Sequence, residues 1–334
     1  MERRERGNLT LVTQFILLGF QDLKNLQVLL FLGFLLIYMV TMAGNLLIVM
    51  LVMTNQHLHT PMYFFLGNLS CLEICYSSAL IPVMLDTLLR NGKPISFSSC
   101  FLQLFFFGYC LGAECYLLSV MSYDRYLAIC KPLHYGTTMN NKKCIQLAAV
   151  SWISGLIGIS IIMVLMLQLT YCGPNEIDHY FCDTVPLKKL SCSDTGLVER
   201  VNLMLLFVYT MPPFILTCTS YVFIIAAILR ISSSTGRQKA FSTCSSHLIV
   251  VSTYYGSLMI VYMLPSSSTL NKAFSLLYTI LPPLVNPLIY SLRNNEVERA
   301  LRKAQSKLCV WKSHILGKIA RPLADLHAHH SPFQ

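Results

Sequence analysis

Long stretches without a charged side chain alternate along this chain with short connections that carry the charges. Besides the stretches with no charge at all, two stretches contain a single acidic residue: Glu73 within residues 61–85 and Glu114 within residues 94–123. Each stretch reaches or exceeds the roughly 20 residues that a helix needs to cross the ~30 Å hydrocarbon core of a bilayer. The stretches that lack Asp, Glu, Lys and Arg altogether are residues 28–53, 144–175, 201–229, 240–271 and 273–292.

The pattern predicts an all-α membrane protein, a bundle of seven transmembrane helices. In lipid only a helix satisfies its own backbone hydrogen bonds within one such segment. The connections are short except for the one around residues 169–199. The alternative, a large soluble helical bundle, would carry about a quarter of charged residues, whereas this chain has 12% charged and 54% hydrophobic residues. The expected spans are residues 27–53, 61–86, 99–125, 145–168, 200–229, 241–264 and 273–292.

The basic residues predict the side of the membrane on which each terminus lies. Of the 25 Lys and Arg residues, 15 fall on one side of the seven spans and 10 on the other. The positive-inside rule therefore predicts an extracellular N-terminus and a cytoplasmic C-terminus in the plasma membrane. Anionic lipid headgroups then account for the net charge of +10 without nucleic acid. A glycosylation sequon at Asn8 falls on the outer side.

The chain divides into four segments. Residues 1–26 form the outer N-terminus, and residues 27–293 form the seven-span domain, whose first span is expected to act as an uncleaved anchor because no cleavage site follows a short apolar core. Residues 294–308 have apolar side chains at helical spacing with charges between them, which predicts an amphipathic helix along the inner membrane surface. Residues 309–334 form the predicted cytoplasmic tail.

Four of the 13 cysteines are expected outside, where disulfides form. Cys100 precedes the third span, and Cys172, Cys182 and Cys192 lie in the long outer connection. Four cysteines allow three pairings, and their spacing does not choose among them. The even number predicts two disulfides that hold this connection across the top of the bundle.

Two acids inside the membrane are functional candidates, because an ionisable side chain is costly there. Glu73 lies near the middle of the second span and Glu114 near the middle of the third. Two carboxylates at similar depth on neighbouring helices predict a shared cation or a shared proton, since two negative charges so close cannot both stay ionised without a counter-charge. The alternative is two protonated acids that are hydrogen-bonded within the core.

The third span carries its polar residues on one face. Counting back from Arg125 by two helical turns, and then by steps of three or four residues, gives Leu118, Glu114, Leu111 and Phe107 on the same face. Because neither Arg125 nor Glu114 is expected to face lipid, this whole face is predicted to look into the bundle. The span thus has an apolar outer half, an acid in its middle and an arginine at its inner end.

Several motifs, in order along the chain, resemble those of the olfactory receptors, a branch of the rhodopsin-like G-protein-coupled receptors. An Asp-Arg-Tyr sequence alone would indicate only the wider class, whereas LHTPMYFFLGNLS and KAFSTCSSHL are typical of the olfactory branch. The motifs are Gly44-Asn45, LHTPMYFFLGNLS (58–70), MSYDRYLAIC (121–130), KAFSTCSSHL (239–248) and NPLIYSLRN (286–294).

The resemblance implies that Arg125 is the activation switch, which meets the α-subunit of a heterotrimeric G protein when the sixth span swings outward. The sixth span has no acid near its inner end to hold Arg125, since Arg237 and Lys239 are basic, so the resting state is expected to rely on Asp124 or His247. The residues assigned to the switch are Asp124, Arg125, Tyr126, Tyr221, Lys239, Asn286, Pro287 and Tyr290.

The resemblance also implies a disulfide from Cys100 to the outer connection. Either Cys182 or Cys192 is a candidate partner, and the family pattern favours Cys182, which leaves Cys172 for Cys192. Glu73 stands where these receptors more often carry Asp, which puts a sodium site in doubt.

The odorant is expected in the outer half of the bundle. Phe107 lies near the position where amine receptors carry an acid, which argues for an uncharged, mostly apolar volatile ligand. The resemblance implies that the receptor then raises cyclic AMP through a stimulatory G protein. By helix position, the residues expected to line the pocket are Phe107, Gly108, Leu111, Gly112, Leu206, Tyr209, Tyr255, Met259, Tyr262 and Thr279.

Other functions are less well supported by the sequence. A transporter or channel would show paired halves or matching broken helices, and an intramembrane enzyme would need clustered catalytic groups. Neither pattern is present, so no enzymatic activity, cofactor or metal is expected. A receptor of the same family that senses a metabolite in another tissue would have the same sequence features, and tissue expression would distinguish it.

Overall fold

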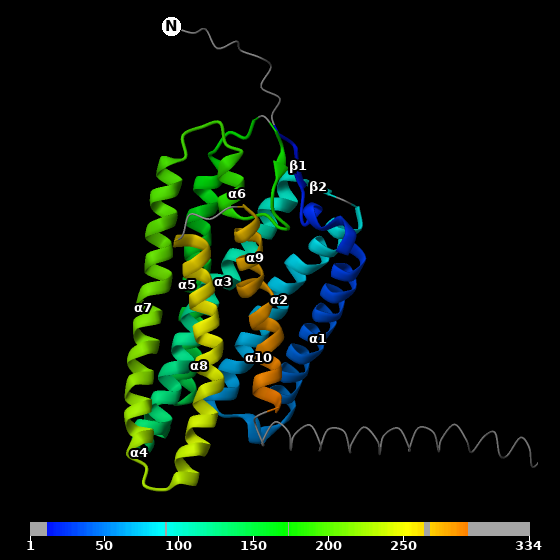
Figure 1. The fold of residues 1–334 in the computed structure, drawn as a ribbon. Helices are drawn as coiled ribbons and strands as arrows, with labels where there is room; N and C mark the ends of the chain where they lie inside the picture. Colours follow the sequence, from blue (N-terminus) through cyan, green and yellow to red (C-terminus); the bar gives the residue numbers. More distant parts are fainter. Residues whose placement is uncertain (1–11, 91, 173, 264–267, 293–334) are drawn as a thin grey trace, which may run out of the picture.

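The fold is a bundle of long helices with a small sheet over one end (Figure 1). The structure, a computed structural model, describes residues 12–90, 92–172, 174–263 and 268–292. Six spans are single helices, and the seventh consists of two. Their bounds are α1 Gln27–Thr54, α2 Pro61–Arg90, α3 Phe97–Cys130, α5 Asn141–Leu167, α7 Gly196–Leu229, α8 Ser234–Met263, α9 Ser268–Thr279 and α10 Leu281–Leu292.

Five of these helices, α1, α2, α3, α5 and α7, are long and apolar enough to cross a membrane. In α8 the apolar stretch is shorter and covers His247–Val261. Large apolar side chains are exposed along the outside of the bundle, as on α1 at Val28, Leu32 and Leu36. Such a surface suits lipid, because hydrocarbon does not penalise exposed apolar groups as water does.

The seventh span differs from the single helix expected over residues 273–292. Helix α9 begins earlier, at Ser268, and the helical run is interrupted at Ile280. Pro282 and Pro283 fall in the first turn of α10, where their missing N–H groups cost little because a first turn has no acceptors for them. The prolines thus start a new helix and do not bend a continuous one.

A three-stranded sheet, which the hydrophobic pattern did not predict, covers one end of the bundle. Strand β1 (Gln14–Leu17) pairs antiparallel with β2 (Lys93–Ser96) and parallel with β3 (Glu176–Ile177). Alternate residues of β1, Phe15 and Leu17, are fully buried, as expected of a strand with one face on the core. The sheet joins the N-terminal segment to the long connection after α5.

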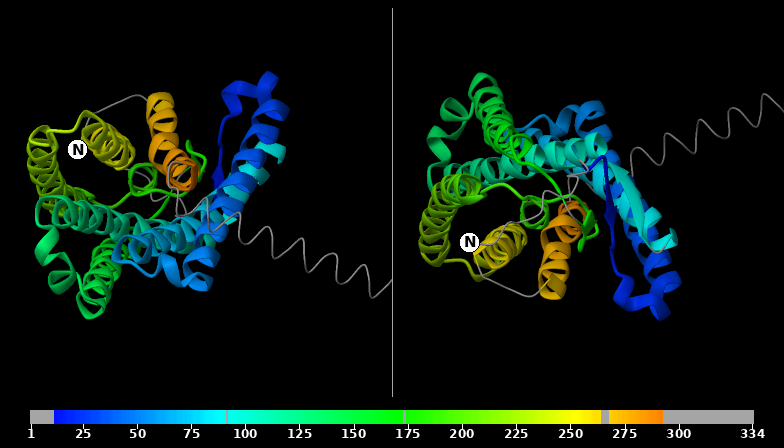
Figure 2. Two further views of the ribbon diagram at one scale, coloured as in Figure 1. Left: turned by 90° about the horizontal axis from the view of Figure 1, so that it is seen from below. Right: turned by 90° about the horizontal axis from the view of Figure 1, so that it is seen from above.

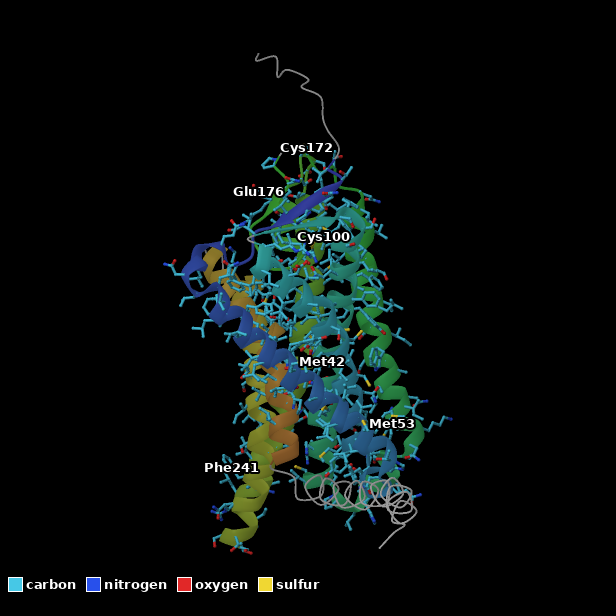
Figure 3. All side chains as sticks on the ribbon, turned by 90° about the vertical axis from the view of Figure 1, so that its right-hand side faces the viewer. Met42, Met53, Cys100, Cys172, Glu176 and Phe241 are labelled. Carbon is cyan, nitrogen blue, oxygen red and sulfur yellow. A yellow bond between two sulfur atoms is a disulfide. The ribbon has the colours of Figure 1, made fainter. Side chains whose placement is uncertain are left out.

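Two short helices also escaped the sequence prediction. Helix α6 (Thr184–Lys189) lies in the connection after α5, and α4 (Pro132–Thr138) follows α3 at the other end of the bundle (Figure 1). We call the end with the sheet and α6 the disulfide end, and the end with α4 the Arg125 end. Figure 3 shows Cys100, Cys172 and Glu176 near the first and Phe241 near the second.

Helix α3 is the central element of the bundle. It packs against α2, α5, α7 and α8, while α1 packs against α2 and α10 (Figure 2). The face predicted from residue spacing is on the inside, since Phe107, Glu114 and Leu118 are at most 2% exposed. The predicted amphipathic helix over residues 294–308, the tail and Asn8 lie outside the described residues.

Candidate ligand-binding site

A pocket opens between α3, α5 and α7 in the half of the bundle nearer the disulfide end. It contains about 750 Å³ of space, a figure that includes solvent at its open side. Along α3 it extends from Leu104 to Cys115, about 17 Å at 1.5 Å per residue. Its lining residues are Leu104, Phe107, Gly108, Leu111, Gly112, Cys115, Gly155, Gly158, Ile159, Ile162, Asp183, Thr184, Asn202, Leu205, Leu206, Tyr209, Thr210 and Leu258.

Glycines on α5 set the width of this pocket. A Cβ atom on Gly155 would lie 2.4 Å from the carbonyl oxygen of Tyr109, so the close approach of α5 to α3 requires glycine there. A Cβ on Gly158 would lie 2.7 Å from the ring of Tyr209. That ring therefore crosses from α7 onto α5, where its hydroxyl donates to the backbone carbonyl of Ser154.

The connection after α5 closes the pocket at the disulfide end. Cys182 is joined to Cys100 by a disulfide with a Cα–Cα distance of 5.5 Å. The backbone N–H of Cys182 donates to Oε1 of Gln103 (2.9 Å), whose Nε2 donates to a backbone carbonyl of α2 (2.9 Å). The next two residues, Asp183 and Thr184, are thereby held against the pocket.

Six of the residues expected from helix position line this pocket. They come from α3, whose inward face was predicted from spacing, and from α7. The six are Phe107, Gly108, Leu111, Gly112, Leu206 and Tyr209.

Three of the other four expected residues are not brought to it. The hydroxyl of Tyr255 donates to the carbonyl of Cys115 (2.6 Å), so this side chain ties α8 to α3. The Thr279 hydroxyl is hydrogen-bonded to Tyr180 (2.9 Å). Met259 is half-buried outside the lining, and the side chain of Tyr262 lies outside the described residues.

Sequence reasoning missed the contribution of α5 and of the connection that follows it. The small residues Gly155 and Gly158, three apart, were a usable signal, because small side chains at helical spacing allow close helix packing in membranes. No comparable signal indicated Asp183, since its position depends on a disulfide and on Gln103. Asn202, six residues into α7, was also missed.

An ion pair and the hydrogen bond between Tyr180 and Thr279 fasten the same connection to α9. Lys272, only 5% exposed, forms an ion pair with Asp178. His179 is also 5% exposed and packs against Tyr180, with ring centroids 4.7 Å apart. Burial, helped by the nearby Lys272 ammonium and opposed by Asp178, lowers the pKa of His179 to about 3. The imidazole is therefore neutral at pH 7.

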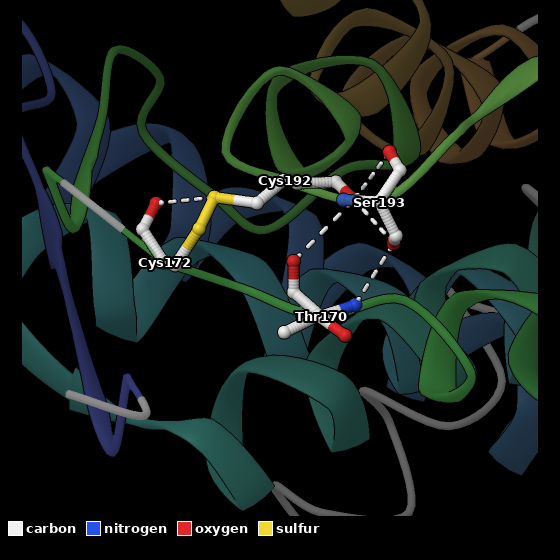
Figure 4. Close-up of a disulfide and its surroundings, with 5 residues drawn as sticks. Thr170, Cys172, Cys192 and Ser193 are labelled. Carbon is white, nitrogen blue, oxygen red and sulfur yellow. Dashed lines mark hydrogen bonds between the residues drawn. A yellow bond between two sulfur atoms is a disulfide. The ribbon is translucent and has the colours of Figure 1, made fainter. Parts of the chain in front are cut away.

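A second disulfide joins Cys172 to Cys192 farther from the pocket (Figure 4). Backbone pairing surrounds it, since the N–H of Cys192 donates to the carbonyl of Thr170 (2.9 Å) and the N–H of Thr170 to Oγ of Ser193 (3.0 Å). The structure thus has the pairing that the motif resemblance favoured. This bridge closes a segment with a sequence separation of 20, against 82 for the bridge to Cys100.

A cluster of buried polar side chains lies deeper in the bundle, between α1, α2, α3 and α10. The Asn286 amide donates to Glu73, and the Asn45 amide donates to the carbonyl of Pro283 (3.1 Å). Glu73 and Glu114 are fully buried. Within the described residues, Oε2 of Glu73 and both carboxylate oxygens of Glu114 have no hydrogen-bond partner. No group of three or more His, Cys, Asp or Glu side chains suited to a metal occurs in that part of the chain.

Comparison with known proteins decides the family. A sequence model described as olfactory receptor matches residues 34–307. Human olfactory receptor 11A1 is 46% identical over 319 residues, which cover 95% of this chain and 100% of that protein. Human olfactory receptor 10A7 is 49% identical over 308 residues, or 91% of this chain and 98% of its own. The chain belongs to the olfactory receptor family. Human olfactory receptor 2AP1 is also similar, with 47% identity over 304 residues, which cover 90% of this chain and 98% of that protein.

Membership of this family confirms the seven-span architecture expected from the sequence. The protein is an odorant receptor of the G-protein-coupled class, it is not an enzyme, and it is a multi-pass protein of the plasma membrane. The pocket between α3, α5 and α7 is thus the candidate odorant site of this receptor.

The Arg125 end of the receptor contains the residues that the motifs assign to activation. Asp124 is 2% exposed and accepts a hydrogen bond from Tyr135 of α4 (2.9 Å). Arg125 is half-buried and forms no ion pair with any described residue. Tyr221 of α7 is hydrogen-bonded to Nδ1 of His247 on α8 (2.6 Å). Helices α4, α7 and α8 therefore each contribute a polar contact at the Arg125 end.

The remaining switch residues are spread over this half of the bundle. The Tyr126 ring packs on Phe223 of α7 at 5.8 Å between centroids, with the Lys131 ammonium 5.9 Å from its centroid. Asn286 belongs to the buried polar cluster, and Pro287 lies against Gly44 of α1. The side chains of Lys239 and Tyr290 lie outside the described residues.

Proposed function

We propose that this receptor binds a small, mostly apolar volatile compound in the pocket and activates a stimulatory heterotrimeric G protein, which raises cyclic AMP. The pocket carries this proposal, because apolar side chains and glycines make up most of its lining. Burial of apolar area contributes about 25 cal/mol per Å², so a small ligand gains modest affinity. Broad tuning to related volatiles follows.

The disulfide end is the extracellular end in this proposal. Both disulfides and strand β1 of the N-terminal segment lie there, and disulfides persist in oxidising compartments. The opposite end carries Arg125 and α4, and it is the end that meets the G protein in the cytoplasm. The N-terminus is then extracellular, where Asn8 is available for glycosylation.

Helix α3 connects ligand and switch in this proposal. It lines the pocket from Leu104 to Cys115 and carries Arg125 ten residues farther on, about 15 Å along the axis. Tyr255 of α8 is hydrogen-bonded to the carbonyl of Cys115 at the pocket floor. A ligand that displaces this contact shifts α8 relative to α3 and opens the Arg125 end to the G protein.

The test is cyclic AMP in cells that express the receptor with a stimulatory olfactory-type G protein, measured across a panel of volatiles. The Arg125→Ala variant is run at matched surface level. An Arg230→Ala variant serves as the control, because Arg230 is exposed at the same end. We expect at least one response that Arg125→Ala abolishes and Arg230→Ala retains. Equal responses in all three proteins would remove Arg125 from the switch.

A second role is proposed for the buried acids, namely coupling to a shared cation or a shared proton. The supporting observation is that three carboxylate oxygens of Glu73 and Glu114 have no hydrogen bond of ordinary geometry within the described residues, although Tyr76 lies beside Glu114, whereas buried polar atoms are nearly always hydrogen-bonded. The oxygens of Asn45 and Asn286 in the same cluster also lack partners there. Oxygen donors suit a hard cation.

Sodium dependence tests this role. Odorant potency is measured with external and internal sodium replaced by choline, and again at stepped pH, in the wild type and in Glu73→Gln and Glu114→Gln. Coupling predicts that sodium or pH shifts the wild-type potency several-fold and that both variants lose that shift. Insensitivity of the wild type to sodium and pH would leave the acids with a purely structural role.

A further inference from the structure

The polar side chains that line the odorant pocket are gathered at one end of it. Asp183 and Thr184 lie on the connection at the disulfide end, with Asn202 on α7. Farther in, the hydroxyls of Tyr209 and Thr210 donate to backbone carbonyls within the protein. The pocket thus offers a polar end under the connection and an apolar end toward the middle of the bundle.

Asp183 stands out among these groups, because it is an acid that is only 4% exposed. Its Oδ1 accepts from the backbone N–H of Thr184 (2.7 Å) and from the Thr184 hydroxyl (3.3 Å), which caps α6. Asp183 also lines a smaller cavity on its other side, together with His179 and Lys189. Asp183 therefore lies between the odorant pocket and this second cavity.

The chemistry of a carboxylate restricts what can lie against it. An ionised carboxylate only accepts hydrogen bonds, so a ligand group in contact with Asp183 must donate. A carbonyl or ether oxygen placed there would meet another acceptor in a buried site, where unpaired polar groups are costly. The Asn202 amide can donate or accept, so it does not reverse this preference.

We propose that the odorant carries a hydrogen-bond-donating head group, a hydroxyl or an ammonium, on an apolar body. The head lies against Asp183 at the disulfide end, and the body extends along α3 toward Cys115. The assignment rests on the proposed function of the pocket and adds the ligand class to it. It also revises the expectation that Phe107 excludes amines, because the acid is supplied by the connection and not by α3.

Matched compounds of one skeleton test the proposal. Octan-1-ol, octylamine, octanal and methyl heptyl ether form one set, and 2-phenylethanol, phenethylamine and phenylacetaldehyde form another. Cyclic AMP is recorded in surface-matched wild type and Asp183→Asn, a change that keeps an oxygen for the cap of α6. In each set that activates the receptor, we expect the alcohol or the amine to be about tenfold more potent than the carbonyl or ether compound, as for one charge-assisted hydrogen bond.

In Asp183→Asn this preference is expected to fall below about threefold, while the control Asp194→Asn, on an exposed part of the same connection, retains it. An amine that exceeds its alcohol would identify an ion pair, and the reverse a neutral donor; both support the proposal. Carbonyl or ether compounds that match the alcohols in the wild type would overturn it, whether or not the variant reaches the surface. So would a preference that survives Asp183→Asn. Either result leaves the proposed function intact, since that fails only if no volatile gives an Arg125-dependent response.

Discussion

The two ends of the bundle are held together by different kinds of interaction. The disulfide end has two disulfides, a three-stranded sheet and all four ion pairs found among the described residues. The Arg125 end relies on single hydrogen bonds between helices, such as Asp124 to Tyr135 and Tyr221 to His247. A binding pocket needs fixed walls, whereas a switch needs contacts that can be exchanged at low cost. The difference suits a receptor whose ligand binds at one end and whose partner binds at the other.

Within the disulfide end, the ion pairs are not equivalent. The pairs of Asp86 with Arg90 and Lys93 are partly exposed, and such pairs contribute up to about 1 kcal/mol. Lys272 is almost fully buried in its pair with Asp178. That pair and the Cys100–Cys182 bridge both fix the connection just before Asp183.

The largest expected effect comes from the disulfides. The double variant Cys100→Ser/Cys182→Ser should nearly abolish surface expression, because loss of a native disulfide costs about 2–5 kcal/mol. Cys172→Ser/Cys192→Ser should retain part of it. In the chain-entropy model the two bridges differ by about 1 kcal/mol, given separations of 82 and 20 residues. Flow cytometry with a surface epitope tag measures both, and an equal loss would contradict this ranking.

The next largest effect is on stability, and it should differ between the two partners of the ion pair, Lys272 and Asp178. Asp178→Asn leaves the Lys272 ammonium buried without its charged partner and should lower the stability of the purified receptor by about 2–3 kcal/mol. Lys272→Met leaves Asp178, whose side chain is 49% exposed, in contact with water, so its cost should stay below about 1 kcal/mol. Thermal unfolding in detergent gives both values, with Lys93→Met as the surface-pair control. The reverse order would show that the Lys272 ammonium is not the buried partner of this pair.

At the Arg125 end the expected change is in signalling. Tyr135→Phe removes the hydroxyl that donates to the buried Asp124 carboxylate, and an unsatisfied group of this kind costs about 1–3 kcal/mol. The carboxylate should turn to Arg125 and hold it, which lowers the maximal cyclic AMP response several-fold at equal surface level. Tyr123→Phe, the same change at the α3 residue next to Asp124, is the control. An unchanged response would mean that Asp124 does not restrain Arg125.

The smallest effect concerns pH. The pKa of His179 is lowered to about 3 by burial and by Lys272, whereas an unfolded chain titrates near 6.5. Between these values the unfolded state binds more protons, so stability falls as the pH falls from about 6.5 toward 3. The slope is at most about 1.4 kcal/mol per pH unit. The melting temperature of purified receptor between pH 7.5 and 5 should lose part of this dependence in His179→Gln and keep it in His57→Gln, an exposed control.

Much of the architecture could be predicted because membrane spans are long apolar segments. The predicted and observed first spans differ by one residue at the end, 27–53 against Gln27–Thr54. The spacing of Phe107, Glu114 and Leu118 also identified the buried face of α3. An acid inside the membrane settles which face points inward, because lipid cannot solvate it.

Where a span carries no such residue, the sequence was less informative. Helix α5 is apolar on every side, so its hydrophobicity does not distinguish the face toward lipid from the face toward α3. The role of Gly155 and Gly158 in the pocket emerged only from the approach of α5 to Tyr109 and Tyr209. Likewise the interruption at Ile280 depends on which turn of the helix receives the two prolines.

The sequence by itself determined the number of spans, the family and the Asp-Arg-Tyr motif around Arg125, because each depends on residues that are neighbours along the chain. Only the tertiary structure decided which side chains meet in the pocket. Asp183 reaches it through a disulfide to Cys100 and a hydrogen bond from Cys182 to Gln103, partners 79 to 82 residues apart. Such contacts arise when distant segments pack together, and no local periodicity records them.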